Sequence, residues 1–503
     1  MIFLGQYVIG IDLGTSAVKL ILVNVKGEVV DSVSKSYPLI QEKSGYSEQD
    51  PEEWYRQTIA GLKQLLENFD GNPEEIKGLS FSGQMHGLVL LNEENKVLRH
   101  AILWNDTRTT KQCEQIYNTI GENRLLKITK NPALEGFTLP KILWVMEKEP
   151  HIFKQVHKFL LPKDYVRFRL TNKIHMDYSD AAGTLLLDVR NNSWSQEILK
   201  AFHIPEKICP ALVHSHDFVG RITAEIASET GLAETTKVFA GGADNACGAI
   251  GAGVLEEGKT LCSIGTSGVI LSYELNSERD FSGKVHYFNH AVANTYYTMG
   301  VTLSAGYSLS WFRDTFAKDQ AYDELLKGIN KIPIGSNGLL FTPYLVGERT
   351  PHADSNIRAS FIGIDSSHTI KHFARAVLEG ITFSLNETIE IFRESGKSID
   401  TIISIGGGAK NEDWLQMQAD IFNTRVIKLR SEEGPGMGAA MIAAYGCGWF
   451  ESLKECADIF LEKDREYNPI KENVEQYKSL FQIYQELYSK TNEISKALAE
   501  FRR

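Results

Sequence analysis

The sequence is poor in the features that mark several classes of protein. Its 503 residues include only six cysteines, and no two of these are spaced as C-x-x-C. Such sparse cysteines are typical of reduced thiols and exclude a disulfide framework. With 14 prolines, 41 glycines and 43% hydrophobic residues, the composition also excludes a disordered or collagen-like chain. The length indicates a globular protein of two or three domains.

The sequence also has no excess of positive charge and no long hydrophobic run. Its 53 Lys and Arg against 64 Asp and Glu leave a net charge of -11, which opposes binding to a polyanion such as a nucleic acid. The longest apolar-rich run, 437–450, is shorter than the ~18 residues that cross a bilayer. The first ten residues contain no basic segment of a signal peptide. We therefore expect a soluble, cytoplasmic protein without a nucleic-acid or membrane partner.

The most informative feature that is present is an internal repeat. Gly14-Thr15-Ser16 lies between two apolar runs, and Gly265-Thr266-Ser267 lies between two others, 251 residues further on. Because this spacing is half the chain length, the repeat predicts two structurally related domains. We place them at residues 1–254 and 255–503, with 251–258 as a candidate hinge for closure of the domains around a substrate.

Strand-like and helical patterns alternate along both halves. Strand-like runs are expected at 76–82, 88–91, 102–104, 296–299, 338–341 and 401–405. The clearest amphipathic helix is 51–69, which begins with the favourable order Asp50-Pro51. Apolar residues spaced along 472–501 predict a long packed helix near the end of the chain. These patterns predict an α/β fold with mixed sheets flanked by helices.

Both Gly-Thr-Ser turns suit phosphate groups. Glycine has no Cβ, so backbone N–H groups can converge on a phosphate, and the Thr and Ser hydroxyls add donors. Asp12 precedes the first turn by two residues. Two such turns that face one another would hold the phosphates of a nucleotide across a cleft, whereas a single one is usually an ordinary turn.

A second pattern is an apolar strand that ends in Gly241-Gly242 and is followed by Asp244 and Asn245. The structural interpretation of Asp244 is an N-cap, because Asp is favoured at that position. A helix N-terminus would also lower the pKa of the carboxyl group. Phosphoryl transfer tolerates such a base, because its loose transition state needs a carboxylate mainly to orient the attacking hydroxyl. Asp244 is therefore a candidate general base.

Polar loops follow several of the expected strands. Gln84-Met85-His86 and Trp104 offer groups that suit sugar hydroxyls and an indole face that suits a sugar's C–H surface. For His86 alone the residues favour a buried core histidine, because no metal-ligand spacing includes it. Residues 405–411 form a glycine-rich strand exit that could carry an adenosine. The glycines at 248–253 and 434–438 are interpreted as helix-packing positions.

These motifs resemble the FGGY family of carbohydrate kinases, in the superfamily of hexokinase, actin and the chaperone ATPases. Residues 136–145 and 359–379 match two signature regions, and the resemblance runs from Tyr7 to about residue 448. The sequence departs from the family at Ala243 and Asn172, where glycine is more usual. The resemblance implies two actin-like or ribonuclease H-like domains around a central cleft that binds a nucleotide and a sugar.

Within the family, the segments 83–87, 160–167, 179–184 and 344–352 are most similar to members that phosphorylate D-xylulose. The resemblance implies transfer from Mg²⁺-ATP to the sugar's terminal hydroxyl, giving D-xylulose 5-phosphate, and a homodimer. It implies Asp244 as the base and Asp12 as a second catalytic residue that holds Mg²⁺. The implied sugar contacts are Gln84, Met85, His86, Trp104 and Asn245, and the implied nucleotide contacts are Gly14, Thr15, Thr266, Gly306, Gly407 and Asn411.

Two alternatives remain at this point. Paired phosphate turns also serve nucleotide-switched binding proteins such as actin, although a switch has no need of the polar loop at 83–87 or of Asp244-Asn245. The other alternative is a kinase for a different sugar or polyol, such as ribulose, gluconate or fuculose. An acidic sugar would need an arginine beside Met85, and none is adjacent in the sequence, which favours a neutral sugar.

Overall fold

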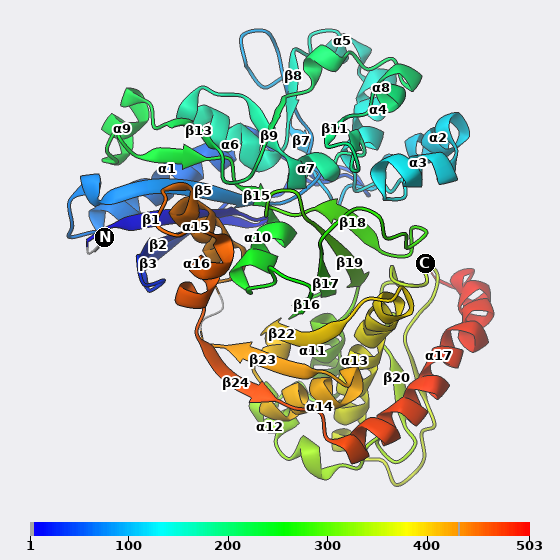
Figure 1. Ribbon diagram of the computed structural model, residues 1–503. Helices are drawn as coiled ribbons and strands as arrows, with labels where there is room; N and C mark the ends of the chain where they lie inside the picture. Colours follow the sequence, from blue (N-terminus) through cyan, green and yellow to red (C-terminus); the bar gives the residue numbers. More distant parts are fainter. Residues whose placement is uncertain (1–4, 431–432, 503) are drawn as a thin grey trace.

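The computed structural model describes residues 5–430 and 433–502, so the outer ends of the expected domains, residues 1 and 503, lie outside the described residues. Two seven-stranded mixed sheets form the two lobes of the molecule (Figure 1). The first sheet contains β13 (Phe218–Arg221), β14 (Lys237–Phe239), β5 (Ile76–Gly83), β1 (Tyr7–Leu13), β2 (Ala17–Asn24) and β3 (Val29–Ser36) in this order, with β15 (Gly242–Ala243) beside β5. The second contains β18 (His286–Asn289), β19 (Tyr296–Thr302), β17 (Gly268–Glu274), β16 (Gly258–Ile264), β22 (Ile399–Gly406), β23 (Arg425–Leu429) and β24 (Lys463–Tyr467).

The two sheets repeat one strand arrangement. In the first, β3, β2 and β1 are antiparallel neighbours, β1, β5 and β14 are parallel, and β13 is antiparallel at the edge. In the second, β19, β17, β16, β22, β23 and β24 follow the same sequence of directions. Each Gly-Thr-Ser turn closes the central hairpin of its sheet, with Leu13 opposite Val18 and Ile264 opposite Gly268. The predicted fold class of two related α/β lobes is confirmed; the division after residue 254 remains a prediction.

Three of the expected strands lie outside the two main sheets. The runs at 88–91, 102–104 and 338–341 appear as short strands in separate two-stranded sheets. The strands of these small sheets are β4 (Glu48–Gln49), β6 (Val89–Leu91), β7 (Ala101–Ile102), β8 (Lys158–Leu160), β9 (His175–Asp177), β10 (Leu187–Asp188), β11 (Ser193–Trp194), β12 (Ala211–Val213), β20 (Leu340–Thr342) and β21 (Ser360–Ile362). Apolar alternation marks a strand but does not identify the sheet that it joins.

Helices cover the sheets on both sides (Figure 1). The N-terminal lobe carries α1 (Pro51–Glu67), α2 (Thr110–Ile120), α3 (Glu122–Thr129), α4 (Thr138–Lys148), α5 (Pro150–Phe153), α6 (Pro162–Thr171), α7 (Tyr178–Ala182), α8 (Gln196–Ala201), α9 (Ala224–Thr230) and α10 (Asp244–Gly251). Later in the chain come α11 (Gly306–Phe316), α12 (Tyr322–Leu326), α13 (Ile370–Glu394), α14 (Glu412–Phe422), α15 (Gly434–Gly446), α16 (Leu453–Phe460) and α17 (Lys471–Ala499). In the part of the chain that is described, no helix combines the length and apolarity that a membrane span requires.

The chain crosses between the lobes more than once. Although α15 follows β23 of the second sheet, it packs against β1, β2 and β5 of the first, and β24 then returns to the second sheet. Figure 1 shows α15 and α16 on the N-terminal lobe, beside α10. A hinge motion would therefore bend the connections on both sides of α15 and α16 as well as the segment 251–258.

Helices α10 and α15 pack through glycines, as the sequence predicts. A Cβ on Gly438 would lie only 1.9 Å from the carbonyl oxygen of Cys247, and a Cβ on Gly251 would lie 2.2 Å from that of Gly434. The two helix backbones therefore touch, and α10, which begins at Asp244, is held against the central strands of the first sheet.

We expect Gly438→Ala to lower the free energy of unfolding by about 3 kcal/mol, because the new methyl group must push the two helices apart. Urea unfolding would measure the loss. Gly248→Ala is the matched control on α10, since its new Cβ would meet Pro435 Cγ at an ordinary 3.7 Å. The control should be neutral or stabilising by up to ~1 kcal/mol. Equal stabilities of the two variants would contradict this account of the packing.

The expected long helix near the end of the chain is α17 (Lys471–Ala499), and its apolar stripe is buried only in part. Tyr477, Tyr484 and Leu487 are buried, whereas Ile494 and Leu498 are exposed. The first half of α17 packs on α13 and α14, and this accounts for the difference. The apolar stripe of α17 therefore continues beyond the part of the helix that packs on α13 and α14.

Candidate active site

A large cavity lies in the C-terminal lobe beside the turn between β16 and β17. It has a volume of about 620 Å³, and four residues expected at a nucleotide line it: Thr266, Gly306, Gly407 and Asn411. The N-terminus of α11 rests on the turn, since the amide of Gly306 donates to the carbonyl of Gly265 over 2.8 Å. A Cβ on Gly306 would lie 2.3 Å from that same oxygen, so only glycine allows this approach.

Backbone groups around this cavity suit a phosphate and a nucleoside. The amide of Thr266 donates to no acceptor in the described part of the chain, and the side chain of Thr266 is exposed. Asn411 caps α14, where its Oδ1 accepts from the amide of Trp414 over 2.9 Å. Its Nδ2 group remains for a nucleotide. The glycine-rich exit of β22 packs directly on Ile264, with a Cβ on Gly408 only 2.5 Å from the Ile264 side chain.

The first Gly-Thr-Ser turn lies outside the 620 Å³ cavity, and the hydroxyl group of its Thr15 already forms hydrogen bonds. Thr15 Oγ1 accepts from the indole Nε1 of Trp104 over 3.0 Å and donates to Gln84 Oε1 over 3.2 Å. The amide of Thr15 donates to no described acceptor, while that of Gly14 closes the turn on Ala17. A phosphate contact from this turn would therefore use backbone N–H groups.

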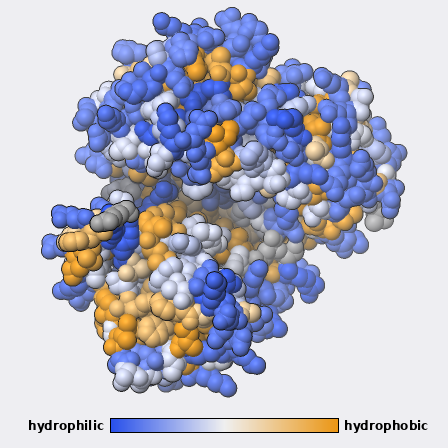
Figure 2. Space-filling model, turned by 180° about the vertical axis from the view of Figure 1, so that it is seen from behind, coloured by the Kyte–Doolittle hydropathy of each residue, from blue (hydrophilic) through white to orange (hydrophobic). Residues whose placement is uncertain are grey.

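A second cavity, of about 230 Å³, lies between the lobes and is lined by residues from both. Figure 2 shows the surface hollowed across the middle of the molecule. The N-terminal lobe contributes Met85, His86, Trp104, Asp244 and Asn245, which are five of the six residues expected at a substrate or as the base. The sixth, Gln84, is not part of this lining: its side chain is buried and bonds to Gln49 and Thr15. The substrate role implied for Gln84 has no support from its position.

His86 is both a satisfied histidine and a cavity residue. Its Nδ1 lies 2.6 Å from the carbonyl oxygen of Gly183, so Nδ1 carries the proton and donates. Burial, together with the charge of Lys141, lowers the pKa of His86 to about 3. The neutral ring therefore presents Nε2 as an acceptor for a hydroxyl group. The residue is held at a φ of 69°, a left-handed conformation that is uncommon outside glycine and often found at functional sites.

Asp244 differs from expectation in two respects. It is the first residue of α10 rather than its N-cap, and its Oδ1 accepts from the amide and the Nδ2 of Asn245 over 2.7 and 3.0 Å. The expected lowering of its pKa is wrong: burial, together with the charge of Asp12, raises the pKa to about 7. Desolvation and a neighbouring carboxylate outweigh the helix N-terminus.

Asp12 lies at the end of β1, opposite Lys19, and burial raises its pKa as well. When two carboxyl groups are close, the negative charge of each makes ionisation of the other less favourable, and a cation between them relieves this repulsion. Carboxylate oxygens are also the ligands that Mg²⁺ prefers. The residues present therefore fit a divalent ion at Asp12, next to the first Gly-Thr-Ser turn.

The sequence analysis missed the residues that the C-terminal lobe contributes to the smaller cavity. Arg349 lines it with an exposed side chain that forms no hydrogen bond or ion pair within the described residues. His286, stacked on Phe288, lies on the same wall. No arginine is adjacent to Met85 in the sequence, but Arg349 lines the same cavity from the other lobe. Its only sequence signal was the position of Arg349 in the segment 344–352.

The molecule has two lobes that repeat one mixed sheet. It contains a nucleotide-sized cavity on a phosphate turn and a smaller polar cavity with paired aspartates. These features define a protein that binds a nucleotide beside a second small molecule. Residues 7–251 match the N-terminal domain, and residues 260–447 the C-terminal domain, of the FGGY family of carbohydrate kinases. The chain belongs to this family.

Individual relatives agree with this assignment. The chain is 62% identical over 498 residues to the xylulose kinase of Bacillus subtilis (strain 168), and this match covers 99% of this chain and 100% of that protein. Its structure matches that of a ligand-bound xylulose kinase from Lactobacillus acidophilus with a TM-score of 0.92 at 30% identity, over 97% of this chain and 98% of that one. A gluconate kinase from Lactobacillus acidophilus also gives a TM-score of 0.92 at 30% identity, over 99% and 100%.

Proposed function

We propose that this protein transfers the γ-phosphoryl group of ATP to the terminal hydroxyl of D-xylulose, giving D-xylulose 5-phosphate. The observation that carries the proposal is the 230 Å³ cavity, which brings Asp244 and Asn245 together with His86 and Trp104. The high identity to a xylulose kinase over nearly the whole chain supports D-xylulose as the acceptor.

Asp244 is the proposed general base. Because Asn245 holds its Oδ1, and Oδ2 accepts from no described residue, Oδ2 is free for the sugar's hydroxyl. The hydroxyl oxygen bonds to the γ-phosphorus, the bond from that phosphorus to the β,γ-bridging oxygen breaks, and ADP leaves. The hydroxyl proton passes to Asp244. Nε2 of His86 accepts from a second hydroxyl and orients the sugar, while the side chain of Trp104 lies along the cavity wall.

Asp12 would hold Mg²⁺, which would offset the charge that develops on the phosphate oxygens. Closure of the two lobes would exclude water and so limit hydrolysis of ATP. A homodimer stays a prediction from the family resemblance, and a cytoplasmic location stays a prediction from the sequence composition.

A coupled assay of ADP release tests the proposed function. With Mg²⁺ and ATP, we expect the highest kcat/KM for D-xylulose in a panel with D-ribulose, L-ribulose, L-fuculose, gluconate and glycerol. Preference for another acceptor would overturn the substrate but keep the phosphotransferase. ATP binding without stimulation by any sugar would favour a nucleotide switch instead.

Arg349 favours a second candidate substrate, a sugar acid. The guanidinium of Arg349 forms no hydrogen bond or ion pair among the described residues, although the charges of Glu135 and Glu348 act on it, and a guanidinium matches the geometry of a carboxylate. Its charge lowers the pKa of both His86 and His286, which line the same cavity. A sugar that offers its terminal hydroxyl to Asp244 would place C1 near Arg349.

D-Xylonate and xylitol distinguish this candidate, because both match D-xylulose at C3 to C5 and differ from each other only in the carboxylate at C1. If the cavity accepts sugar acids, the wild type should prefer D-xylonate over xylitol by at least tenfold, and Arg349→Gln should abolish that preference. Equal kcat/KM values in the wild type would exclude the acid and leave D-xylulose as the acceptor.

A further inference from the structure

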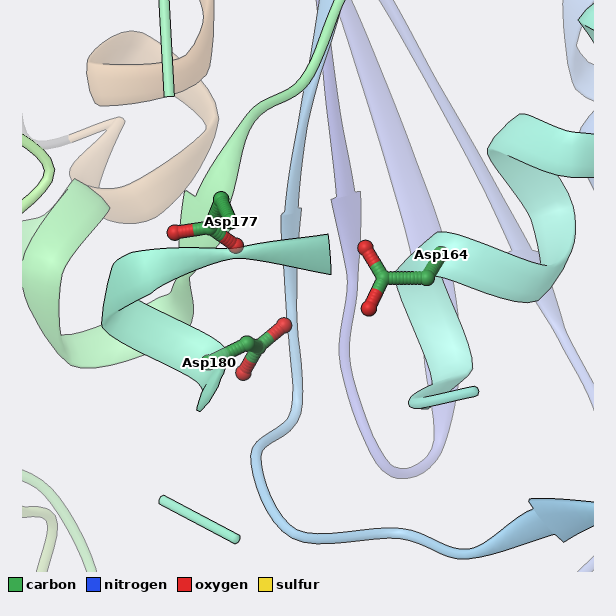
Figure 3. A group of neighbouring side chains, drawn as sticks. All are labelled: Asp164, Asp177 and Asp180. Carbon is green, nitrogen blue, oxygen red and sulfur yellow. The ribbon is translucent and has the colours of Figure 1, made fainter. Parts of the chain in front are cut away.

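A group of buried charged side chains lies behind the cavity that holds Asp244. Lys163, Asp164 and Arg167 of α6, with Asp177 and Asp180 at α7, all have side chains with 0% exposure. The Nζ of Lys163 lies 2.7 Å from Asp164 Oδ1, 2.6 Å from Asp177 Oδ1 and 2.8 Å from Asp180 Oδ2. Figure 3 shows the three carboxylates directed toward one region between the elements that carry them.

The three aspartates lie close enough together to hold a metal ion, but Lys163 already takes the place of a cation among them. Burial raises the pKa of Asp180 well above its ordinary value. Lys163 and Arg167 supply two positive charges opposite the three carboxyl groups, so the counter-charges in this group come from the protein itself. Burying charges in this way costs desolvation energy, so stability alone does not explain why the group is present.

Hydrogen bonds connect this group to the turn that precedes the proposed base. Nη1 of Arg167 donates to the carbonyl oxygen of Ala240 over 2.5 Å. The amide of Ala243 donates to Ser179 Oγ over 2.9 Å, and both the amide and the hydroxyl of Ser179 donate to Asp177 Oδ2. The buried group therefore fixes the backbone at both ends of the segment 240–243.

The same short helix also holds the sugar side of the cavity. Helix α7 ends at Ala182 and is followed by its C-cap Gly183, whose carbonyl oxygen accepts from Nδ1 of His86. A Cβ on Gly183 would lie 2.9 Å from that nitrogen, so the backbone of α7 and the ring are in direct contact. Lys163 packs against the start of the loop 83–87, which carries His86, because its Cβ lies 2.7 Å from the position of a Cβ on Gly83.

We propose that α7 positions the reacting groups for phosphoryl transfer, and that Ser179 is the positioning residue that links the buried group to the turn before Asp244. Anchored through Asp177 and Asp180 on Lys163, the helix sets the spacing between His86 on the sugar and the base on its terminal hydroxyl. This inference rests on the proposed role of Asp244 and applies to whichever sugar the enzyme phosphorylates.

Two serine variants test the proposal, because the chain offers a matched pair. Ser179 and Ser215 are both buried, and both hydroxyls donate to Oδ2 of Asp177, from Ser215 over 3.2 Å. Only the Ser179 hydroxyl also accepts from Ala243. We expect Ser179→Ala to lower kcat by about 10- to 100-fold, because small misplacements of a reacting group have effects of this size. Ser215→Ala should keep kcat within about twofold of the wild type.

A purely structural role would not produce this division between kcat and the other properties. For both variants, the KM for the sugar and the Kd for ATP should stay within about threefold of the wild type, and the two melting temperatures should fall by similar amounts. Equal kcat values for the two variants, or losses of kcat that follow the losses in melting temperature, would overturn the proposal. The preferred sugar of the wild type, measured first, decides the proposed function separately.

Discussion

Replacing Asp244 by asparagine should lower kcat by about 10³-fold, within the ~10²- to 10⁴-fold range that a positioned general base contributes. The amide keeps the shape of the side chain and can still bond to Asn245, but it cannot take the hydroxyl proton. The Kd for ATP should change little, because Asp244 lines the smaller cavity and not the 620 Å³ one. Single-turnover transfer and equilibrium ATP binding would measure the two effects, and near-native turnover would exclude Asp244 as the base.

Stability provides an independent check on the same variant. The pKa of Asp244 in the folded protein, about 7, lies above its ordinary value, so the folded state binds the proton more tightly than the unfolded state. The stability that this carboxyl group contributes is therefore fully present below its ordinary pKa of ~4 and is lost as the pH rises from there through about 7. Asparagine does not ionise and avoids that loss.

Without Mg²⁺ and nucleotide, Asp244→Asn should therefore unfold at a higher temperature than the wild type at pH 8, and the difference should shrink as the pH falls toward ~4. Asp12→Asn removes the other half of the repulsion. In a double-mutant cycle, the stabilising effects of the two substitutions should be less than additive at pH 8. Additive effects, or a difference that does not depend on pH, would contradict the electrostatic link between Asp12 and Asp244.

The sequence predicted those parts of the site that depend on local pattern. The two Gly-Thr-Ser turns can be recognised in the sequence because a hairpin turn and the strands beside it occupy about 17 consecutive residues. The same holds for the glycines of α10 and α15, whose spacing on a helix shows that one face must be small. Asp244 and Asn245 were predicted in the same way, as polar residues just after an apolar strand, and Asn411 as the end of a glycine-rich strand exit; their roles stay predictions.

Properties that arise between distant segments could not be predicted. The pKa of Asp244 depends on Asp12, which belongs to a strand at the other end of the N-terminal lobe's sequence. Arg349 reaches the sugar cavity from the C-terminal lobe, so its distance along the chain from Met85 says nothing about their distance in space. Gln84 shows the reverse: it directly precedes Met85 and His86, which line the cavity, yet its side chain turns toward Gln49.

The second large effect is expected at Lys163, where methionine should cost about 3–5 kcal/mol of unfolding free energy. This is the usual cost of removing one partner from a buried ion pair, because the charge left behind is uncompensated. Among the described residues, Lys163 is the one cation that contacts all three aspartates, and its loss leaves Arg167, which pairs with Asp164. Urea unfolding followed by circular dichroism would measure the change.

The loss should deepen as the pH rises. Burial already holds the pKa of Asp180 well above its ordinary value, while Lys163 pulls it down. Without the lysine, the folded protein must hold protons on its buried carboxyl groups, and protons become scarcer at higher pH, so the deficit at pH 8 should exceed that at pH 5.5. A deficit below about 1 kcal/mol at pH 8, far under the usual cost of breaking a buried pair, would contradict the charge balance inferred for the group.

Lys397 is the matched control for this substitution. Its ammonium group is also buried and bonds to Glu274 over 2.6 Å, but Glu274 keeps a second partner in Arg279, 3.3 Å away. Lys397→Met should therefore cost less than Lys163→Met, although both remove a buried ammonium group of the same size. If the two variants lost equal stability with the same dependence on pH, the cost would come from removing any buried lysine. A larger and more pH-dependent loss at Lys163 would show instead that this one side chain neutralises the aspartates behind the active site, and that α7 depends on it for its place.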